Sequence, residues 1–398
     1  MKLLDPIVAW RDEISQIRRD IHAHPELAFE EFRTADVVAA KLEEWGIEIH
    51  RGLGGTGVVG TIRGNRPGER AVGLRADMDA LPMQEANTFA HASQHAGKMH
   101  ACGHDGHTAM LLAAARYLSQ HRDFAGTVYV IFQPAEEGGG GAKRMIDDGL
   151  FTRFPMEAVF GMHNWPGMAP GQFGVTAGPI MASSNEFSIV IKGKGTHAGM
   201  PNLGIDPVMA AVQLAQSLQT IITRNRNPLD AAVLSITQIH AGSADNVVPN
   251  HAELRGTVRT FTLEVLDLIE RRMEEIARHT CAAMDCEVEF TFQRNYPPTI
   301  NHPDEAAFCA DVMRDIVGDD KVNAHVQPTM GAEDFAFMLQ ELPGCYVWIG
   351  NGVGDHRAAG HGLGPCMLHN GSYDFNDELL PLGGTYWVQL ALKRLAKP

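Results

Sequence analysis

The chain has 398 residues, with 33 Lys and Arg against 48 Asp and Glu, so its formal net charge is −15 with histidine neutral. This acidic balance argues against a nucleic-acid or anionic-membrane binder, because such surfaces are held mainly by Lys and Arg contacts to phosphate. A composition of 44% hydrophobic and 20% charged residues is that of a soluble globular protein, and the length suggests two or three domains at roughly 100–200 residues each.

The start of the chain lacks the apolar segment and small-residue cleavage site of a secretory signal. No later run approaches the roughly 18–20 apolar residues that a membrane span needs, so we expect a cytoplasmic protein. Its six cysteines are too thinly spread for a disulfide framework and are expected to be small buried groups. Only Cys102 has neighbours that suggest another role.

The first predicted element is a helix that Asp5 caps and Pro25 ends. Pro6 suits the first helical position, and apolar residues recur at steps of three and four between these limits. A second helix is predicted over residues 34–45, with Gly46 as its C-terminal cap.

Short apolar runs then alternate with helical segments. This alternation predicts an α/β domain with a mostly parallel sheet flanked by helices. The predicted strands cover residues 58–62, 71–75, 127–132, 158–162 and 346–349, and a predicted helix covers residues 108–118.

Residues 184–293 have a different pattern. Alternating apolar residues and helical stretches predict the order strand, helix, strand, strand, helix, strand, which is typical of a ferredoxin-like α+β domain. We therefore expect this segment to be an inserted lid or dimerisation domain, and residues 1–183 and 294–398 to form a discontinuous catalytic domain. Its predicted elements are a strand around 187–191, a helix over 207–222, strands over 232–239 and 252–261, a helix from residue 262 and a strand around 288–292.

Titratable residues cluster beside the predicted strands of the larger domain, where functional groups of open α/β sheets gather at the carboxyl ends. Carboxylates, a thiol and imidazoles at one edge would repel one another or stay desolvated unless a cation bound them. The four clusters are RADMDALP at residues 75–82, HACGHDGH at 100–107, QPAEEGGGG at 133–141, and His163.

Cys102 and His104 are two residues apart, so in an extended loop they point the same way, and the glycine between them permits a tight backbone. This pair suits a divalent metal with affinity for nitrogen and sulfur. Glu136 and Glu137 on a glycine-rich turn must point in different directions. One can bind metal while the other acts as general base in metal-assisted hydrolysis, in which the metal lowers the pKa of a bound water.

Each group also has an ordinary explanation. A single histidine such as His163 is more often a hydrogen-bonded structural residue, and adjacent carboxylates are more often a solvated loop. The remaining histidines, His22 and His91 among them, are interpreted as surface or capping groups, and His107 as a residue that supports the ligand run.

Five motifs together resemble the N-acyl-amino-acid amidohydrolases, the branch of the aminoacylase/carboxypeptidase metallohydrolase superfamily that contains hippurate and auxin-conjugate hydrolases. The resemblance runs from residue 21 to residue 375. The motifs are RADMDALP at 75–82, MHACGHDGH at 99–107, QPAEEGG at 133–139, GTHAGMP at 195–201 and LHNGSYDFN at 368–376.

The resemblance implies a two-metal centre with Glu136 as general base. Asp79 matches an aspartate that orients a metal ligand in the wider superfamily, although Asp77 stands where that pattern has a ligating histidine. The ligands carried over are Cys102, His104, Glu137, His163 and His369.

The resemblance also implies roles for the inserted domain. His197 matches a histidine that reaches over the site to stabilise the oxyanion, in the same or the partner subunit, when a lid closes. Asn246 and Arg259 match a pair that binds the acyl oxygen and free carboxylate of the substrate. A homodimer or higher homo-oligomer is plausible from relatives.

The implied activity is metal-dependent hydrolysis of the amide bond of N-acyl amino acids, such as N-acetyl or N-benzoyl compounds, to a carboxylic acid and a free amino acid. Two divalent ions per subunit are expected, Mn²⁺ or Zn²⁺, with Co²⁺ or Ni²⁺ as further candidates. The partner is then a small molecule, not nucleic acid or membrane. The alternatives are an aminopeptidase- or dipeptidase-like metallohydrolase, a thiol hydrolase with Cys102 as nucleophile, and a non-catalytic amino-acid-binding protein.

Overall fold

The structure, a computed structural model, describes residues 1–357 and 359–396 and divides into two compact units. Unit 1 comprises Met1–Ile180, Ile300–Gln327 and Asp334–Pro398, and unit 2 comprises Met181–Thr299 and Pro328–Glu333. The short segment 328–333 joins unit 2 although it lies outside the inserted range expected from the sequence. The lid and dimerisation roles of the inserted part stay predictions.

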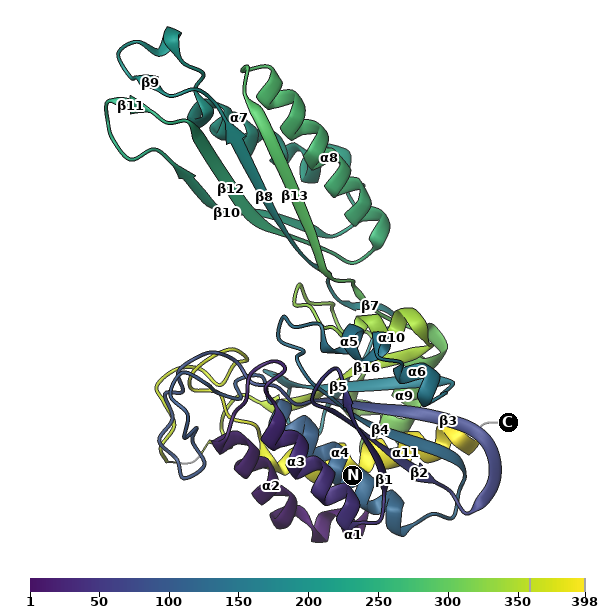
Figure 1. Cartoon of the computed structure of the whole chain (residues 1–398). Coiled ribbons are helices and arrows are strands. Elements are labelled where there is room, and N and C mark those ends of the chain that lie inside the picture. Colours follow the sequence, from purple (N-terminus) through teal and green to yellow (C-terminus); the bar gives the residue numbers. More distant parts are fainter. Residues whose placement is uncertain (358, 397–398) are drawn as a thin grey trace. The chain divides into compact units, whose positions relative to one another are not determined.

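Unit 1 is built on a sheet of eight strands (Figure 1). Its four central strands, β4, β3, β5 and β16, are parallel, so their carboxyl ends meet at one edge of the sheet. The mixed, mostly parallel sheet predicted from the sequence is confirmed. In spatial order the strands are β1 (Glu48–Leu53), β2 (Gly57–Arg63), β4 (Ala125–Gln133), β3 (Arg66–Asp77), β5 (Ala158–Pro166), β16 (Gly344–Gly352), β6 (Phe173–Gly174) and β15 (Val322–Asn323).

Helices cover this sheet. The helices α4 and α11 pack against β3, and α3 packs against β1 and β2, while in the view of Figure 1 α5 and α10 lie above β5. The helices of unit 1 are α1 (Asp5–Ala9), α2 (Arg11–Ala23), α3 (Phe32–Glu44), α4 (His104–Gln120), α5 (Gly141–Asp147), α6 (Leu150–Arg153), α9 (Pro303–Val317), α10 (Ala336–Glu341) and α11 (Leu380–Ala396), with short 3₁₀ turns at Asp319–Lys321 and Asp377–Leu379.

The helix α4 lies in the core of unit 1. Its residues from His104 to Ala115 are all buried, because α2, α3 and α11 pack around it and it also contacts β3. A helix enclosed on most sides needs small and apolar residues all round, and its MLLAAA sequence at residues 110–115 supplies them. This packing fixes the start of α4, where the ligand run lies.

Two predicted helix limits are wrong. The single helix expected from residue 5 to residue 24 is divided into α1 and α2 at Trp10, whose backbone (φ −88°, ψ 1°) departs from the helical region, and Asp5 does not cap it. The helix expected to start at residue 108 begins at His104. Gly103, at φ +91°, turns the chain directly into α4, so Cys102 lies just before the helix and His104 is its first residue.

Unit 2 has a separate core between a four-stranded antiparallel sheet and two helices. The sheet order β10–β12–β8–β13 is that of a ferredoxin-like domain, as predicted. Asp206 caps α7 and Thr262 caps α8 with their side chains. The elements are β8 (Ser184–Lys192), α7 (Pro207–Thr220), β10 (Ala232–Ala241), β12 (His251–Thr260), α8 (Leu263–Ala282) and β13 (Glu287–Tyr296), with β9 (Thr196–His197) paired to β11 (Val247–Val248), a one-turn helix at Pro201–Leu203 and a π-helical turn at Ile221–Asn225. Where the units join, β7 (Gly178–Met181) pairs with β14 (Thr299–Asn301).

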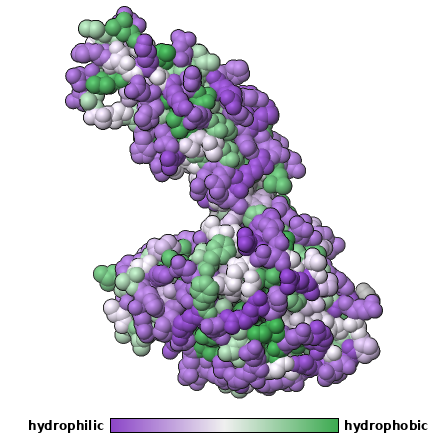
Figure 2. Space-filling view, viewed as in Figure 1, coloured by the Kyte–Doolittle hydropathy of each residue, from purple (hydrophilic) through white to green (hydrophobic). Residues whose placement is uncertain are grey.

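The surface in view is mostly hydrophilic on both units (Figure 2). All six cysteines are free thiols and all are buried, as expected. Among the described residues, no helix is both long and apolar enough to cross a membrane.

Candidate metal centre

Five predicted ligands form one cluster at the carboxyl edge of the sheet in unit 1. Three overlapping groups of side chains have ligand atoms within 4.8 Å of one another, and Cys102, His104 and Glu137 each belong to two of them. The groups are Cys102, His104 and His163; Cys102, Glu137 and His369; and His104, Glu136 and Glu137.

The Cys102–Gly103–His104 run owes its shape to close packing against its glycine. A Cβ atom on Gly103 would lie 2.3 Å from the Asn164 side-chain nitrogen and 2.4 Å from the Tyr373 hydroxyl. The Asn164 amide donates to the Cys102 carbonyl (2.7 Å), and the Tyr373 hydroxyl donates to the Asn164 side-chain oxygen (2.8 Å). This clamp directs the Cys102 sulfur to within 3.3 Å of the His163 Nε2 atom.

Glu136 and Glu137 lie on a tight turn after β4. The residue before them, Ala135, has φ +55°, a left-handed conformation that is uncommon outside glycine. The Glu136 Oε1 atom accepts from the backbone N–H of Asp334 (3.3 Å), whereas the Glu137 carboxylate lies 3.1 Å from the His369 Nε2 atom. The two carboxylates therefore point to different partners, as the sequence predicts.

Asp79 joins two of the ligand-bearing segments. Its side chain accepts from the His104 Nδ1–H group (3.2 Å) and from the Glu137 backbone N–H (2.9 Å), and its carbonyl also accepts from His104 Nδ1 (2.9 Å). The bond at Nδ1 leaves His104 Nε2 facing the cluster. This is how a carboxylate sets the tautomer and orientation of a metal-binding histidine.

His163 and His369 approach the cluster from the ends of other elements. His163 lies on β5 and donates from Nδ1 to the Asn164 carbonyl (2.6 Å), which leaves Nε2 toward Cys102. His369 has φ +57° and is held by a bond from its backbone N–H to the Ala101 carbonyl (2.8 Å). It is also half exposed, with 54% of its side chain accessible.

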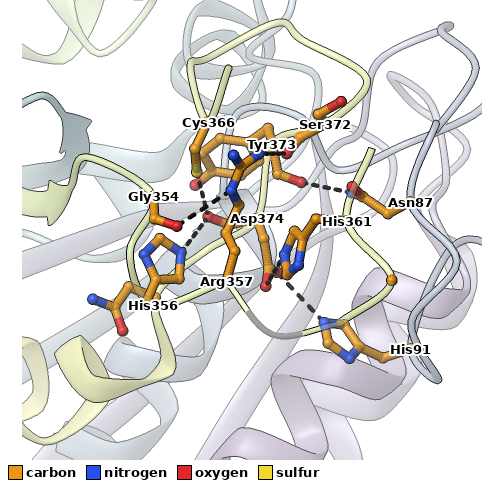
Figure 3. Close-up of polar contacts among 12 residues, drawn as sticks. Asn87, His91, Gly354, His356, Arg357, His361, Cys366, Ser372, Tyr373 and Asp374 are labelled. Carbon is orange, nitrogen blue, oxygen red and sulfur yellow. Dashed lines mark hydrogen bonds and ion pairs between the residues drawn. The ribbon is translucent and has the colours of Figure 1, made fainter. Parts of the chain in front are cut away.

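The chain segments before and after His369 are held together around Asp374 (Figure 3). The Arg357 guanidinium donates to the carbonyls of Gly364 (3.0 Å) and Ser372 (3.1 Å). The His91 Nε2 atom is 3.4 Å from one carboxylate oxygen of Asp374, and the His361 Nε2 atom is 3.3 Å from the other. His91 is thus part of the support for the loop, which its sequence context did not indicate.

Asp77 contributes to a further group with His104 and His107. His107 donates from Nδ1 to Asp77 (2.6 Å), and its Nε2 accepts from the Asn164 backbone N–H (2.9 Å), so His107 supports the clamp on the ligand run. Arg75 holds Asp77 from the opposite side at 2.5 Å. The sequence indicated this supporting role for His107 but not the part played by Arg75, whose buried charge gives no periodic signal.

The charges of the site oppose one another strongly. Burial alone would lower the pKa of His104, but Asp77, Asp79 and Glu137 outweigh it and raise that pKa to about 10. Burial and the nearby carboxylates Glu137 and Glu136 raise the pKa of the Cys102 thiol well above its usual range, and burial lowers that of His163. Such opposed shifts mark functional sites.

Donor chemistry and burial both fit divalent cations here. The His104 Nε2 atom is buried and has no hydrogen-bond partner among the described residues, and the buried Glu137 Oε1 atom has the His369 Nε2 atom 3.1 Å away. Polar atoms buried in that way are costly unless a water or an ion satisfies them. Sulfur, imidazole and carboxylate ligands within one cluster suit zinc or a similar transition metal.

The predicted residues of the inserted part lie in unit 2. His197 is exposed on β9 and borders a cavity of about 800 Å³ that Asn246 also lines. Arg259 is near the end of β12, and the first residue of this strand is His251. At 3.4 Å per residue, these two residues are about 27 Å apart along the strand. Asn246 lies before the start of β12, so it and Arg259 are on opposite ends of this strand in unit 2.

The sequence interpretation missed three residues beside the site. Glu31 bonds to the turn that carries Glu136, Asp334 bonds to Glu136 through its backbone, and His22 is fully buried rather than at the surface. Glu31 belongs to the polar run FEEFRT at residues 29–34, which looks like a solvated helix start. Only tertiary contacts distinguish it from its exposed neighbour Glu30.

A family model described as peptidase family M20/M25/M40 matches residues 73–392 of the chain. This range contains the whole ligand cluster. It also spans unit 2, so the match covers both units.

Individual proteins match over almost the whole chain. A hippurate hydrolase of Campylobacter jejuni is 40% identical over 99% of this chain and 100% of its own length, and an N-acetylcysteine deacetylase of Bacillus subtilis is 39% identical over 96% and 97%. The thermostable carboxypeptidase 2 of Saccharolobus solfataricus is 40% identical over 98% of both. Among solved structures, the YXEP protein of Bacillus subtilis, described as a dinuclear metal binding peptidase from the M20 family, has a TM-score of 0.84 and 35% identity over 99% of this chain and 100% of its own.

Proposed function

Because the chain belongs to peptidase family M20/M25/M40, we propose that it is a metal-dependent amidohydrolase that cleaves the amide bond of N-acyl amino acids. The products are a carboxylic acid and a free amino acid. The observation that carries the proposal is one cluster that joins the five predicted ligand side chains and in which a carboxylate oxygen of Glu136 lies within 4.8 Å of ligand atoms of His104 and Glu137. Relatives named for hippurate and N-acetylcysteine support this substrate class.

We assign the metal ligands as Cys102, His104, Glu137, His163 and His369, with two cations of the Mn²⁺ or Zn²⁺ type. When bound, such cations lower the pKa of water and polarise the scissile carbonyl. Glu136 performs the proton transfers: its carboxylate takes a proton from the attacking water and returns it to the leaving amine nitrogen. Asp79 keeps His104 in the tautomer that presents Nε2 to the cluster.

In unit 2, we assign His197 to the stabilisation of the oxyanion and Asn246 and Arg259 to substrate binding. A single donor aimed at a developing oxyanion is worth about 3–4 kcal/mol of barrier. Asn246 precedes β11 and Arg259 lies near the end of β12, and this separation favours a role for two chains in the binding. The homodimer therefore remains part of the proposal.

The thiol hydrolase is the weaker alternative. Burial and the adjacent carboxylates raise the pKa of Cys102, which disfavours a free thiolate nucleophile. A strong chelator should abolish turnover if Cys102 is a ligand and should spare it if Cys102 is the nucleophile.

Cleavage of peptides is a second candidate function, favoured by the carboxypeptidase relative. Comparing the rates of hydrolysis of N-acyl amino acids, dipeptides and longer peptides distinguishes an N-acyl amino acid hydrolase from a peptidase.

The direct test of the mechanism compares two adjacent substitutions. Glu136→Gln should lower kcat by roughly 10²–10⁴-fold while the metal content stays at the wild-type level. Glu137→Gln is the matched control and should lower the metal content instead. Steady-state kinetics with N-benzoylglycine and N-acetyl amino acids, together with metal analysis of each variant, measure both effects. A Glu136→Gln variant with wild-type kcat would rule out Glu136 as the base.

A further inference from the structure

The proposed mechanism gives no role to one buried carboxylate near the site, that of Glu31. Glu31 is 0% exposed and lies just before α3. Its Oε1 atom accepts from the backbone N–H groups of Ala135 (2.9 Å) and Phe29 (3.0 Å), and its Oε2 atom accepts from the Thr56 hydroxyl (2.6 Å). One carboxylate thus links three segments that are far apart in the sequence.

The bond to Ala135 reaches the turn at its most constrained point. Ala135 is the residue directly before Glu136, and its φ of +55° is a backbone conformation that costs free energy in residues other than glycine. The angle φ describes the rotation about the N–Cα bond of Ala135, so it changes when the peptide group that carries the Ala135 N–H turns. A fixed acceptor for that N–H therefore holds the left-handed conformation.

One other bond acts just before Ala135, where the Gln133 side-chain amide donates to the Pro134 carbonyl (3.1 Å), and the rest act after it. Asp79 accepts from the Glu137 backbone N–H (2.9 Å), and Asp334 donates through its backbone to the Glu136 side chain (3.3 Å). Within the turn, the Gly141 N–H donates to the Ala135 carbonyl (3.0 Å). In the described structure, the acceptor recorded for the Ala135 N–H is the Glu31 carboxylate.

Burial of this carboxylate is itself costly. Desolvation, together with the nearby Asp79 charge, raises the pKa of Glu31 to about 7 despite the bonds that it accepts from Thr56 and Ala135. An acid kept in such a place, with three donors converging on it, has a local function. Its neighbour Glu30 is exposed and pairs with Lys98 instead.

We infer that Glu31 is a positioning residue, which holds Ala135 in its left-handed conformation and so orients the carboxylates of Glu136 and Glu137. The geometry of the turn is independent of what the protein hydrolyses. The kinetic consequence rests on the proposed function, so the test has one readout that needs no activity.

That readout is amide hydrogen exchange of metal-free protein, followed in peptides that cover residues 133–141. Glu31→Leu removes both acceptor oxygens, and exchange in this segment should become at least tenfold faster. The helix α9 (Pro303–Val317) should exchange at the wild-type rate. Glu30→Leu is the matched control for an apolar change at an adjacent, exposed acid, and should leave exchange in residues 133–141 unchanged.

The kinetic readout separates positioning from proton transfer. With an N-acyl amino acid, Glu31→Leu should lower kcat about 100-fold with KM within threefold of wild type, since a misplacement of about 1 Å can cost that much. Glu31→Gln keeps an acceptor for the Ala135 and Phe29 N–H groups but cannot titrate. It should restore kcat to within tenfold of wild type, with an unchanged pH profile.

Three results would overturn the inference. Wild-type exchange in residues 133–141 of Glu31→Leu overturns the inference, whether or not the protein hydrolyses any amide. Loss of kcat in Glu31→Gln equal to that in Glu31→Leu overturns it too, because the charge or proton would then matter rather than the position. If Glu31→Leu does not fold, Glu31→Asp, which is one methylene shorter, should still speed exchange and lower kcat, and wild-type behaviour in both assays would contradict the inference.

Discussion

At the scale of single residues, buried polar side chains hold the segments that carry the proposed metal ligands. His22 is fully buried and donates from Nδ1 to Asp105 (2.9 Å) and from Nε2 to Glu85 (3.2 Å). Two donating nitrogens require the imidazolium form. Burial would lower the pKa of His22, but its bonds to Asp105 and Glu85 raise it to about 9. Since Asp105 directly follows the proposed ligand His104, this ion pair stabilises the start of α4.

This arrangement predicts a pH-dependent contribution to stability. A histidine whose pKa rises from 6.5 to about 9 on folding stabilises the protein fully below pH 6.5, and this stabilisation is lost as the pH rises through 9. Replacing His22 by Leu should therefore destabilise the protein more at pH 6 than at pH 9.5, with a difference of up to about 3 kcal/mol. Urea unfolding of both proteins at the two pH values measures this, and equal destabilisation at both would contradict it.

At the scale of elements, the position of the site follows from strand direction. The parallel strands β3, β4 and β5 end at one edge, and α4 begins there with the ligand run. The abrupt entry into α4 depends on Gly103, which combines a positive φ with close contacts to Asn164 and Tyr373.

A glycine pair separates these two causes. Gly103→Ala should disrupt the ligand run and lower the affinity for divalent metal at least tenfold, because its methyl group would meet atoms at 2.3 and 2.4 Å. Gly97→Ala is the matched control: Gly97 has φ +77° but no atom within 4 Å of the added Cβ, so only the backbone cost of about 1 kcal/mol remains. Metal titration and thermal unfolding of both variants test this. Similar metal affinity in the two would show that the contacts to Asn164 and Tyr373 are unimportant.

The sequence predicted the elements and residues whose signals are local. Strand patterns located β3, β4 and β5, and motif spacing identified Cys102 and His104. Apart from the meeting of the predicted ligand residues, the sequence did not predict the contacts made across the fold. Glu31 is 104 positions from Ala135, and Asp334 is 198 positions from Glu136. Such bonds leave no periodicity or spacing in the chain, so Glu31 looks like its solvated neighbour Glu30.

At the scale of the whole molecule, the residues with proposed functions are divided between two units with separate cores. The ligand cluster and Glu136 belong to unit 1, whereas His197, Asn246 and Arg259 belong to unit 2. Loss of one of these three unit 2 side chains should therefore affect turnover and leave the ligand cluster intact.

His197→Ala tests this division. It should lower kcat by about 100-fold or more, in line with the loss of one oxyanion donor, and leave the metal content unchanged. The exposed His240, which borders the same cavity, provides the control, because its replacement by Ala should leave kcat within threefold. A His197→Ala variant that loses metal would contradict the assignment of this residue to the oxyanion.

The central claim is that ligands from four separate segments of unit 1 hold two divalent cations beside Glu136. Anomalous X-ray diffraction from crystals loaded with Mn²⁺ or Zn²⁺ measures this most directly. We expect two anomalous peaks, each about 2.0–2.4 Å from its ligand atoms among Cys102, His104, Glu137, His163 and His369. Fully active crystals without an anomalous peak within reach of these atoms would contradict the account.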